Sequence, residues 1–192
     1  FLYIQDTIGK ASTGSTYLWD FGDQNANAGS TNTSTLQNPA HVYTAAGNYL
    51  VTLTVTSESG CEMTVSKNLV VNGSPKAAFQ VINSNKLCSG IPVVFEENGS
   101  IDFGEVTRIE WVFDLVNDPL TIMIDENPRK SAEPAKKYEH QYPAFSSPVA
   151  KTYLVKMTAY SGLSCVSEQM QEIVLNAMPE VTFDSLQLVC ID

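Results

Sequence analysis

The chain has 192 residues, of which 43% are hydrophobic, and a formal net charge of −10 from 11 basic and 21 acidic residues. With no basic face for a phosphate backbone and no run of 18 apolar residues to span a bilayer, we expect neither nucleic acid binding nor membrane insertion of this segment. The length fits two domains of ordinary size, each able to bury its own core.

The first half of the chain is predicted to form strands joined by turns. Trp19 is expected on a central strand that ends in a tight turn at Gly22. Residues 49–56 alternate large and small side chains, which is typical of a strand with one buried face, and residues 57–60 form a turn. A return strand is expected from Met63 to Val71.

The second half repeats the spacings of the first. The interval from Tyr3 to Trp19 has the same length as the interval from Phe95 to Trp111. The interval from Tyr49 to Cys61 likewise equals the interval from Tyr153 to Cys165. Equal spacings of this kind are unlikely by chance. They predict an array of modules, each with its own small core.

Proline follows both halves at equivalent places, Pro75 and Pro179. We therefore expect a β-sandwich over 1–73 that lacks its first strand, a divergent sandwich with longer loops over 74–176, and the first strand of a third repeat over 177–192. No segment has a long 3.6-residue apolar period, and turns recur every eight to twelve residues. The predicted fold class is all-β, with tandem β-sandwiches.

One set of residues in the first half has a pattern of its own: Trp19, Asp20, Phe21, Gly22 and Asp23, followed by His41, Tyr43, Gly47 and Tyr49. This pattern resembles the polycystic kidney disease (PKD) domain family, whose members are immunoglobulin-like sandwiches of cell-surface proteins. A divergent copy retains Trp111, His140, Tyr142 and Tyr153 but loses the polar turn.

The resemblance implies an extracellular or cell-surface location and a non-catalytic role in adhesion, or as a spacer that displays other domains. The implied partners are neighbouring repeats of the same protein, a surface polysaccharide or a matrix protein. The alternative is a carbohydrate-binding accessory region of a secreted hydrolase. Exposed aromatic residues in a flat row would favour that alternative, and the candidates are Tyr138, Tyr142 and Phe145.

Catalysis is not expected. His41 and His140 could each serve a Ser-His-Asp site, but a histidine repeated in both modules favours a structural role, since an enzyme needs one site rather than one per repeat. Aspartate pairs such as Asp20 with Asp23 are more often turn formers than the carboxylates of a glycosidase.

Calcium is the one cofactor that the resemblance suggests. Some PKD-like modules bind this ion near the same turn, and Asp20 and Asp23 together with a loop carbonyl would supply the oxygen ligands that it prefers. The second repeat lacks both carboxylates, so a site of this kind would be confined to the first.

The four cysteines lie at repeated places. Cys61 and Cys165 are late in their repeats, whereas Cys88 and Cys190 are early. One hypothesis joins Cys88 to Cys165 within the second repeat. The other joins early and late cysteines of neighbouring repeats, which leaves all four unpaired here. The internal bridge is preferred, although an immunoglobulin-like topology places its two cysteines at opposite ends.

Two connections of the second repeat are longer than those of the first. Trp111 and His140 are further apart in the sequence than Trp19 and His41, and the interval from His140 to Tyr153 is also lengthened. Loops on a rigid sandwich commonly carry binding function, although drifted spacers are the equally good alternative. The candidate binding residues are Leu120, Ile122, Arg129, Lys130, Lys136, Lys137, Tyr138 and Phe145.

Overall fold

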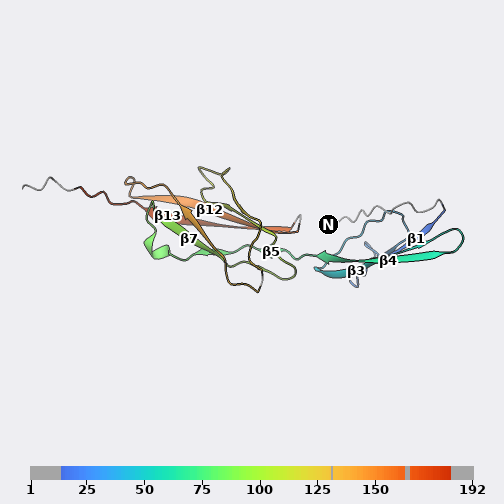
Figure 1. Cartoon of the computed structure of the whole chain (residues 1–192). Helices are drawn as coiled ribbons and strands as arrows, with labels where there is room; N and C mark the ends of the chain where they lie inside the picture. Colours follow the sequence, from blue (N-terminus) through green and yellow to red (C-terminus); the bar gives the residue numbers. More distant parts are fainter. Residues whose placement is uncertain (1–13, 131, 163–164, 183–192) are drawn as a thin grey trace, which may run out of the picture. The chain divides into compact units, whose positions relative to one another are not determined.

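The computed structural model describes residues 14–130, 132–162 and 165–182, which form strands, turns and one short 3-10 helix, η1 (Figure 1). The predicted all-β fold class is confirmed. The elements are β1 (Thr16–Asp20), β2 (Thr33–Ser34), β3 (Gly47–Thr56), β4 (Glu62–Val71), β5 (Pro75–Lys76), β6 (Phe79–Val81), η1 (Ser84–Lys86), β7 (Pro92–Glu97), β8 (Ser100–Ile101), β9 (Arg108–Val112), β10 (Met123–Asp125), β11 (Lys137–Gln141), β12 (Ala150–Ser161) and β13 (Cys165–Asn176).

The described part of the first repeat, from residue 14 onward, contains one four-stranded sheet in the order β2-β1-β3-β4. Alternation in β3 buries Tyr49, Val51 and Leu53 on one face, as predicted. Trp19 on β1 lies opposite Leu53 in the antiparallel register, and these residues form the core together with Phe21 and Val51. The β3–β4 hairpin extends from Gly47 paired with Val71 to Thr56 paired with Glu62.

The second repeat is a sandwich of two sheets. A four-stranded sheet has the order β10-β9-β12-β13, and a three-stranded sheet has the order β11-β7-β6. Trp111 on β9 joins them, because its ring lies 5.0 Å from that of Phe79 on β6, 5.5 Å from Phe95 on β7 and 5.1 Å from Tyr138 on β11. One tryptophan therefore contacts every strand of the facing sheet.

Contacts divide the chain into two compact units. The first comprises Phe1–Pro75 with two further segments, Ile101–Val106 and Tyr160–Val166. The second comprises Lys76–Ser100, Thr107–Ala159 and Ser167–Asp192.

The predicted strand of a third repeat falls largely outside the described residues, since residues 183–192 are not among them. Residues 177–182, which are described, contain no strand. The first-repeat marker Tyr3 also lies outside the described part of the chain. Within that part, no helix is both long and apolar enough to cross a membrane.

Candidate functional site

An aromatic ladder runs through the first repeat at the end of β1. The ring of Phe21 stacks on that of Trp19 at 6.4 Å between centroids and on the imidazole of His41 at 4.3 Å. His41 meets Tyr43 edge-on at 4.6 Å, and Tyr43 contacts Tyr49 at 4.1 Å. Stacked and edge-on pairs at these separations stabilise a core beyond the area that they bury.

The second repeat builds the same ladder from Trp111, Phe113, His140, Tyr142 and Tyr153. Successive centroid distances are 5.7, 4.2, 4.5 and 4.3 Å, with interplanar angles of 7°, 11°, 81° and 43°. The angles in the first repeat are 10°, 9°, 81° and 43°. The motif residues predicted from the sequence thus come together in both repeats, in the same order and orientation.

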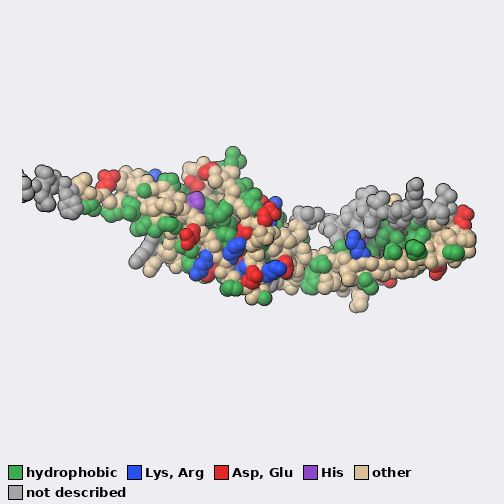
Figure 2. Space-filling model, viewed as in Figure 1, with side chains coloured by type: hydrophobic (Ala, Val, Ile, Leu, Met, Phe, Trp, Pro, Cys, Tyr) green, Lys and Arg blue, Asp and Glu red, His purple; other side chains and the backbone are tan. Residues whose placement is uncertain are grey.

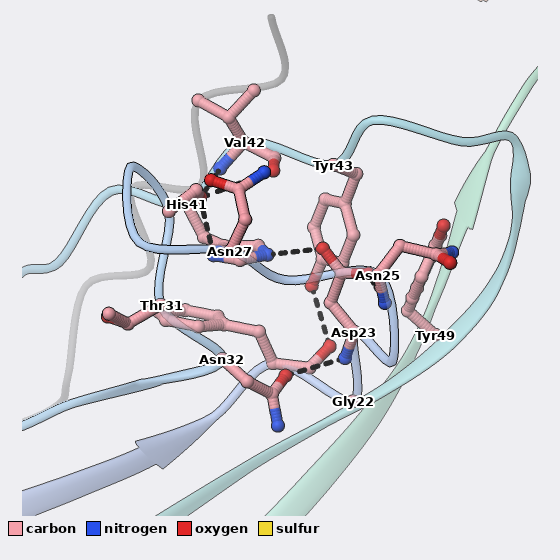
Figure 3. Close-up of polar contacts among 12 residues, drawn as sticks. Gly22, Asp23, Asn25, Asn27, Thr31, Asn32, His41, Val42, Tyr43 and Tyr49 are labelled. Atoms are coloured by element: carbon pink, nitrogen blue, oxygen red, sulfur yellow. Dashed lines mark hydrogen bonds and ion pairs between the residues drawn. The ribbon is translucent and has the colours of Figure 1, made fainter.

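Polar groups close the ladder of the first repeat (Figure 3). His41 Nε2 donates to Asp23 Oδ2 at 2.9 Å, and His41 Nδ1 lies 3.0 Å from Ser30 Oγ. Asp23 Oδ1 accepts the amide hydrogen of Asn25 at 2.9 Å, while the amide of Asp23 donates to Asn32 Oδ1. A histidine, a carboxylate and a serine are therefore connected in line.

This arrangement has the residue types of a catalytic triad, but its histidine is buried and its serine hydroxyl is already hydrogen-bonded. His41 is 2% exposed, with its ring against Phe21. Ser30 Oγ accepts the amide hydrogen of Val42 at 3.1 Å, and its single hydrogen faces two acceptors, the carbonyl oxygen of Val42 at 3.2 Å and His41 Nδ1 at 3.0 Å. These contacts already engage the only hydrogen of the hydroxyl. The geometry supports a structural tie between two loops.

Calcium does not fit the two carboxylates as they lie. Asp23 is buried, and its two oxygens accept hydrogen from Asn25 and His41. Asp20 Oδ1 accepts the amide of Gly22 and the Nδ2 group of Asn32, each at 2.8 Å. A cation would have to displace these N–H donors, which would repel it. Among the described residues, no three His, Cys, Asp or Glu side chains gather as a metal site.

Tyrosine hydroxyls anchor both ladders to the backbone. Tyr43 donates to the carbonyl oxygen of Phe21 at 2.9 Å, and Tyr142 donates to that of Phe113 at 2.8 Å. Burial, followed by the charge of Asp23, raises the pKa of Tyr43 to about 12. Burial likewise raises the pKa of Tyr142, with Asp114 adding to the effect. Both phenols therefore stay protonated donors across the physiological range.

The prediction that Tyr138 is a surface residue for binding is wrong. Tyr138 is 7% exposed, packs on Trp111, and donates its hydroxyl to Asp125 Oδ2 at 2.7 Å. Tyr142, the second aromatic considered for a flat sugar-binding row, is 2% exposed. Tyr138 faces the core because every second side chain of β11 points inward, and Tyr142, directly after the strand, continues this alternation.

Two basic residues of the first insertion are engaged within the fold. Arg129 Nε donates to Glu97 Oε2, and its Nη2 donates to the Gly99 carbonyl, each at 2.6 Å. Lys136 Nζ donates to Asp125 Oδ2 at 2.7 Å. Burial alone would raise the pKa of Asp125, but hydrogen bonds from Lys136 and Tyr138 outweigh it and hold this pKa below its usual value.

The other candidate residues are accessible to different degrees. Leu120 is 89% exposed and Ile122 is 47% exposed, and the side chains of Lys130 and Lys137 are exposed as well. Phe145 is half-buried, with Lys151 Nζ 4.4 Å from its ring centroid. Figure 2 shows the Lys and Arg side chains of the second repeat interspersed with Asp and Glu on the face in view.

The preferred disulfide between Cys88 and Cys165 is wrong, since both thiols are free. Cys88 pairs with Asn176 at one end of β13, whereas Cys165 begins that strand at the other end. Eleven residues at about 3.3 Å each place them roughly 36 Å apart along the strand, far beyond the ~7 Å that a disulfide allows between Cα atoms. Cys61 is also free, and Cys190 lies outside the described residues.

Sequence reasoning missed three residues that hold these structures together. Ser30 and Asn32 lie in a loop rich in small polar residues, where nothing marks one position above the next. Glu97 is buried, accepts from Arg129, and also accepts the amide hydrogen of Gly99 at 2.7 Å. Its only signal is a place within the apolar-alternating strand β7, where an inward-facing carboxylate requires a cationic partner.

Comparison with known proteins identifies one region. Residues 5–71 match the family model of the PKD domain. No curated protein sequence matches the chain. Among solved structures, the amphioxus IgVJ-C2 molecule is similar with a TM-score of 0.39 and 8% identity, over 92% of this chain and 96% of that one.

Proposed function

Because residues 5–71 belong to the PKD domain family, we propose that this chain is a non-catalytic, extracellular repeat module of a large surface or secreted protein. It acts in adhesion or as a spacer that displays other domains, and its nearest partners are neighbouring repeats of the same protein. The observation that carries the proposal is the aromatic ladder, which recurs in both halves with matching angles. A feature built once per repeat serves the repeat, not a single active site.

The Ser30, His41 and Asp23 contacts support the same proposal. Each polar atom in this line is held by a partner whose loss would leave a buried group unsatisfied. A fluorophosphonate probe, which modifies activated serines, is therefore expected to leave Ser30 unlabelled. Ser30→Ala is expected to lower the melting temperature of the first repeat. Labelling of Ser30 that His41→Ala abolishes would contradict a non-catalytic role.

Adhesion and spacing are separated by a binding screen. The chain is tested against soluble and insoluble polysaccharides and matrix proteins, with calcium present and then chelated. The Leu120→Ser/Ile122→Ser double variant removes the exposed apolar residues of the first insertion, and Val65→Ser removes an exposed valine of β4 as the matched control. Binding that only the double variant loses makes the chain an adhesive module. Binding to none of the panel favours a spacer.

The carbohydrate-binding accessory role has less support from the side chains. Two of its three aromatic candidates, Tyr138 and Tyr142, are core residues, and only Phe145 retains partial exposure. Sugar-binding platforms need a ring face open to solvent. A Phe145→Ala variant that lost polysaccharide binding while the Leu120→Ser/Ile122→Ser variant kept it would revive that role.

A further inference from the structure

The early and late cysteines of one repeat lie at opposite ends of it. Cys88 forms an isolated parallel bridge with Asn176, flanked by hydrogen bonds from Ser89 N to Asn176 O at 2.8 Å and from Asn176 N to Leu87 O at 2.9 Å. Asn176 is the last residue of β13, the strand that Cys165 begins (Figure 1). The early cysteine therefore lies where the chain leaves the repeat.

Asn72 is the equivalent of Asn176 in the first repeat, because the interval from Tyr49 to Asn72 has the same length as the interval from Tyr153 to Asn176. The two tyrosines are the last members of their ladders. Within the first compact unit, the amide of the next residue, Gly73, donates to the carbonyl oxygen of Phe103 at 2.9 Å.

The hairpin segment Tyr160–Val166 belongs to this same unit. A Cβ built on Gly162 would lie 3.3 Å from Asn72 Nδ2. This segment contains Cys165, the late cysteine of the second repeat. The asparagine at the exit of one repeat thus lies beside the hairpin that carries the late cysteine of the next.

Both placements involve the same position of the repeat, the exit asparagine. An early cysteine pairs with the exit asparagine of its own repeat, and the late cysteine of the following repeat lies on the hairpin beside that asparagine. We infer that each early cysteine forms a disulfide with the late cysteine of the following repeat, so that the array is stapled end to end. This inference rests on the proposed role of the chain as part of a repeat array.

On this pairing, no two cysteines of the chain form a disulfide with each other. Cys88 takes the late cysteine of the repeat that follows residue 176. Cys165 takes the early cysteine of the first repeat, whose equivalent position precedes Phe1 by five residues, because Cys88 precedes Phe95 by seven and Phe95 matches Tyr3.

The oxidation needs a disulfide donor, such as oxidised glutathione or a thiol-disulfide oxidoreductase. One cysteine thiolate attacks a sulfur of the donor and forms a mixed disulfide, and the released donor thiolate takes up a proton. The second cysteine thiolate attacks the protein sulfur of the mixed disulfide and releases the other donor thiol. Two protein thiols are oxidised and one donor disulfide is reduced to two thiols.

The first test uses the chain as it stands. After equilibration in a buffer of oxidised and reduced glutathione, acid quenching and unfolding without reductant, four free or glutathione-capped thiols per chain are expected by mass spectrometry. Only two free thiols per chain, together with a disulfide-linked peptide pair that contains Cys88 and Cys165, would overturn the inference.

The second test joins two copies of the chain in series. Cys190 matches Cys88, so a two-residue spacer places Tyr3 of the second copy seven residues after Cys190 and completes a third repeat. A tandem that keeps only Cys88 of the first copy and Cys61 of the second, with serine elsewhere, is expected to lose both thiols in the same buffer. The matched control keeps Cys88 and Cys165 of one copy and is expected to retain both.

The resistance of the two added residues to protease distinguishes two kinds of failure. If these residues are protected and both thiols are still free, the repeats assemble without an inter-repeat disulfide, and the disulfide is overturned. If these residues are cleaved as readily as an unfolded peptide, the third repeat does not form, which overturns the proposed array and the disulfide with it.

Discussion

His41 and His140 occupy the same rung of the two ladders but have different polar surroundings. Each stacks on a phenylalanine at 4.3 or 4.2 Å and meets a tyrosine edge-on. His41 is also paired with Asp23 and Ser30. The residue of the second repeat that aligns with Asp23 is Leu115, and there burial lowers the pKa of His140.

The tryptophans differ in a similar way. Trp19 Nε1 donates to the carbonyl oxygen of Leu36 at 3.1 Å. Trp111 Nε1 is buried and has no hydrogen-bond partner among the described residues. The second repeat therefore keeps the aromatic ladder and its tyrosine anchor, but among the described residues it lacks the hydrogen bond of the tryptophan and the aspartate partner of the histidine. Stacking thus defines the module, and these two polar contacts are an addition to it.

Removal of the central aromatic should have the largest effect. Trp111 is fully buried and contacts each strand of the facing sheet. Trp111→Ala is expected to destabilise the second repeat by about 3–5 kcal/mol. Denaturant unfolding followed by circular dichroism measures the loss, with Val116→Ala as a control at an exposed apolar residue. A loss below about 1 kcal/mol, the scale of a surface substitution, would show that aromatic stacking is not the main source of the repeat's stability.

The first repeat can be converted toward the second by Asp23→Leu. This change removes the acceptor of His41 and leaves a buried donor unsatisfied, at a cost of roughly 1–3 kcal/mol. Asp20→Leu is the control in the same turn, where solvent can replace the lost contacts because Asp20 is exposed. Thermal unfolding with Trp19 fluorescence, in a Trp111→Phe background, compares them. Equal effects would mean that burial of the Asp23 pair is unimportant.

Much of this fold follows from local sequence patterns. Alternation in residues 49–56 predicts β3 and its buried face, and equal spacings place Trp19 and Trp111 on equivalent strands. These predictions succeed because a strand with one buried face requires period two, whatever the rest of the chain does.

The errors concern long-range placement. Lys137 to Gln141 alternates as a strand should, but its position in a lengthened connection favours a loop, and a loop would place Tyr138 on the surface. Cysteine spacing cannot tell which end of a sandwich a residue occupies, since that depends on strand direction and register. The partners Ser30 and Glu97 are fixed by contacts across 11 and 32 residues, which no local pattern encodes.

The turn after β1 gives a smaller contrast between the repeats. Gly22 has a φ of +65°, and a Cβ there would lie 2.6 Å from the carbonyl oxygen of Leu50, whereas the second repeat has Asp114 at this place. Gly22→Ala is expected to cost about 1–2 kcal/mol for the backbone conformation and more for the clash. Gly60→Ala has the same kind of φ, +83°, with no atom within 4 Å, and it isolates the conformational cost. Similar melting temperatures for the two variants would show that the clash contributes nothing.

The smallest expected effect is the pH dependence of the second repeat. Because burial lowers the pKa of His140, the unfolded chain takes up a proton near the ordinary pKa of about 6.5 while the folded repeat does not. The stability contributed by neutral His140 is therefore complete above pH of about 6.5 and is lost as the pH falls toward the lower, native pKa.

His140→Phe keeps a ring against Phe113 and should flatten this dependence between pH 8 and 5. Urea unfolding with Trp111 as reporter, in a Trp19→Phe background, measures both slopes. If they are the same, His140 is not the titrating group, and the missing acid partner has no energetic consequence for the second ladder.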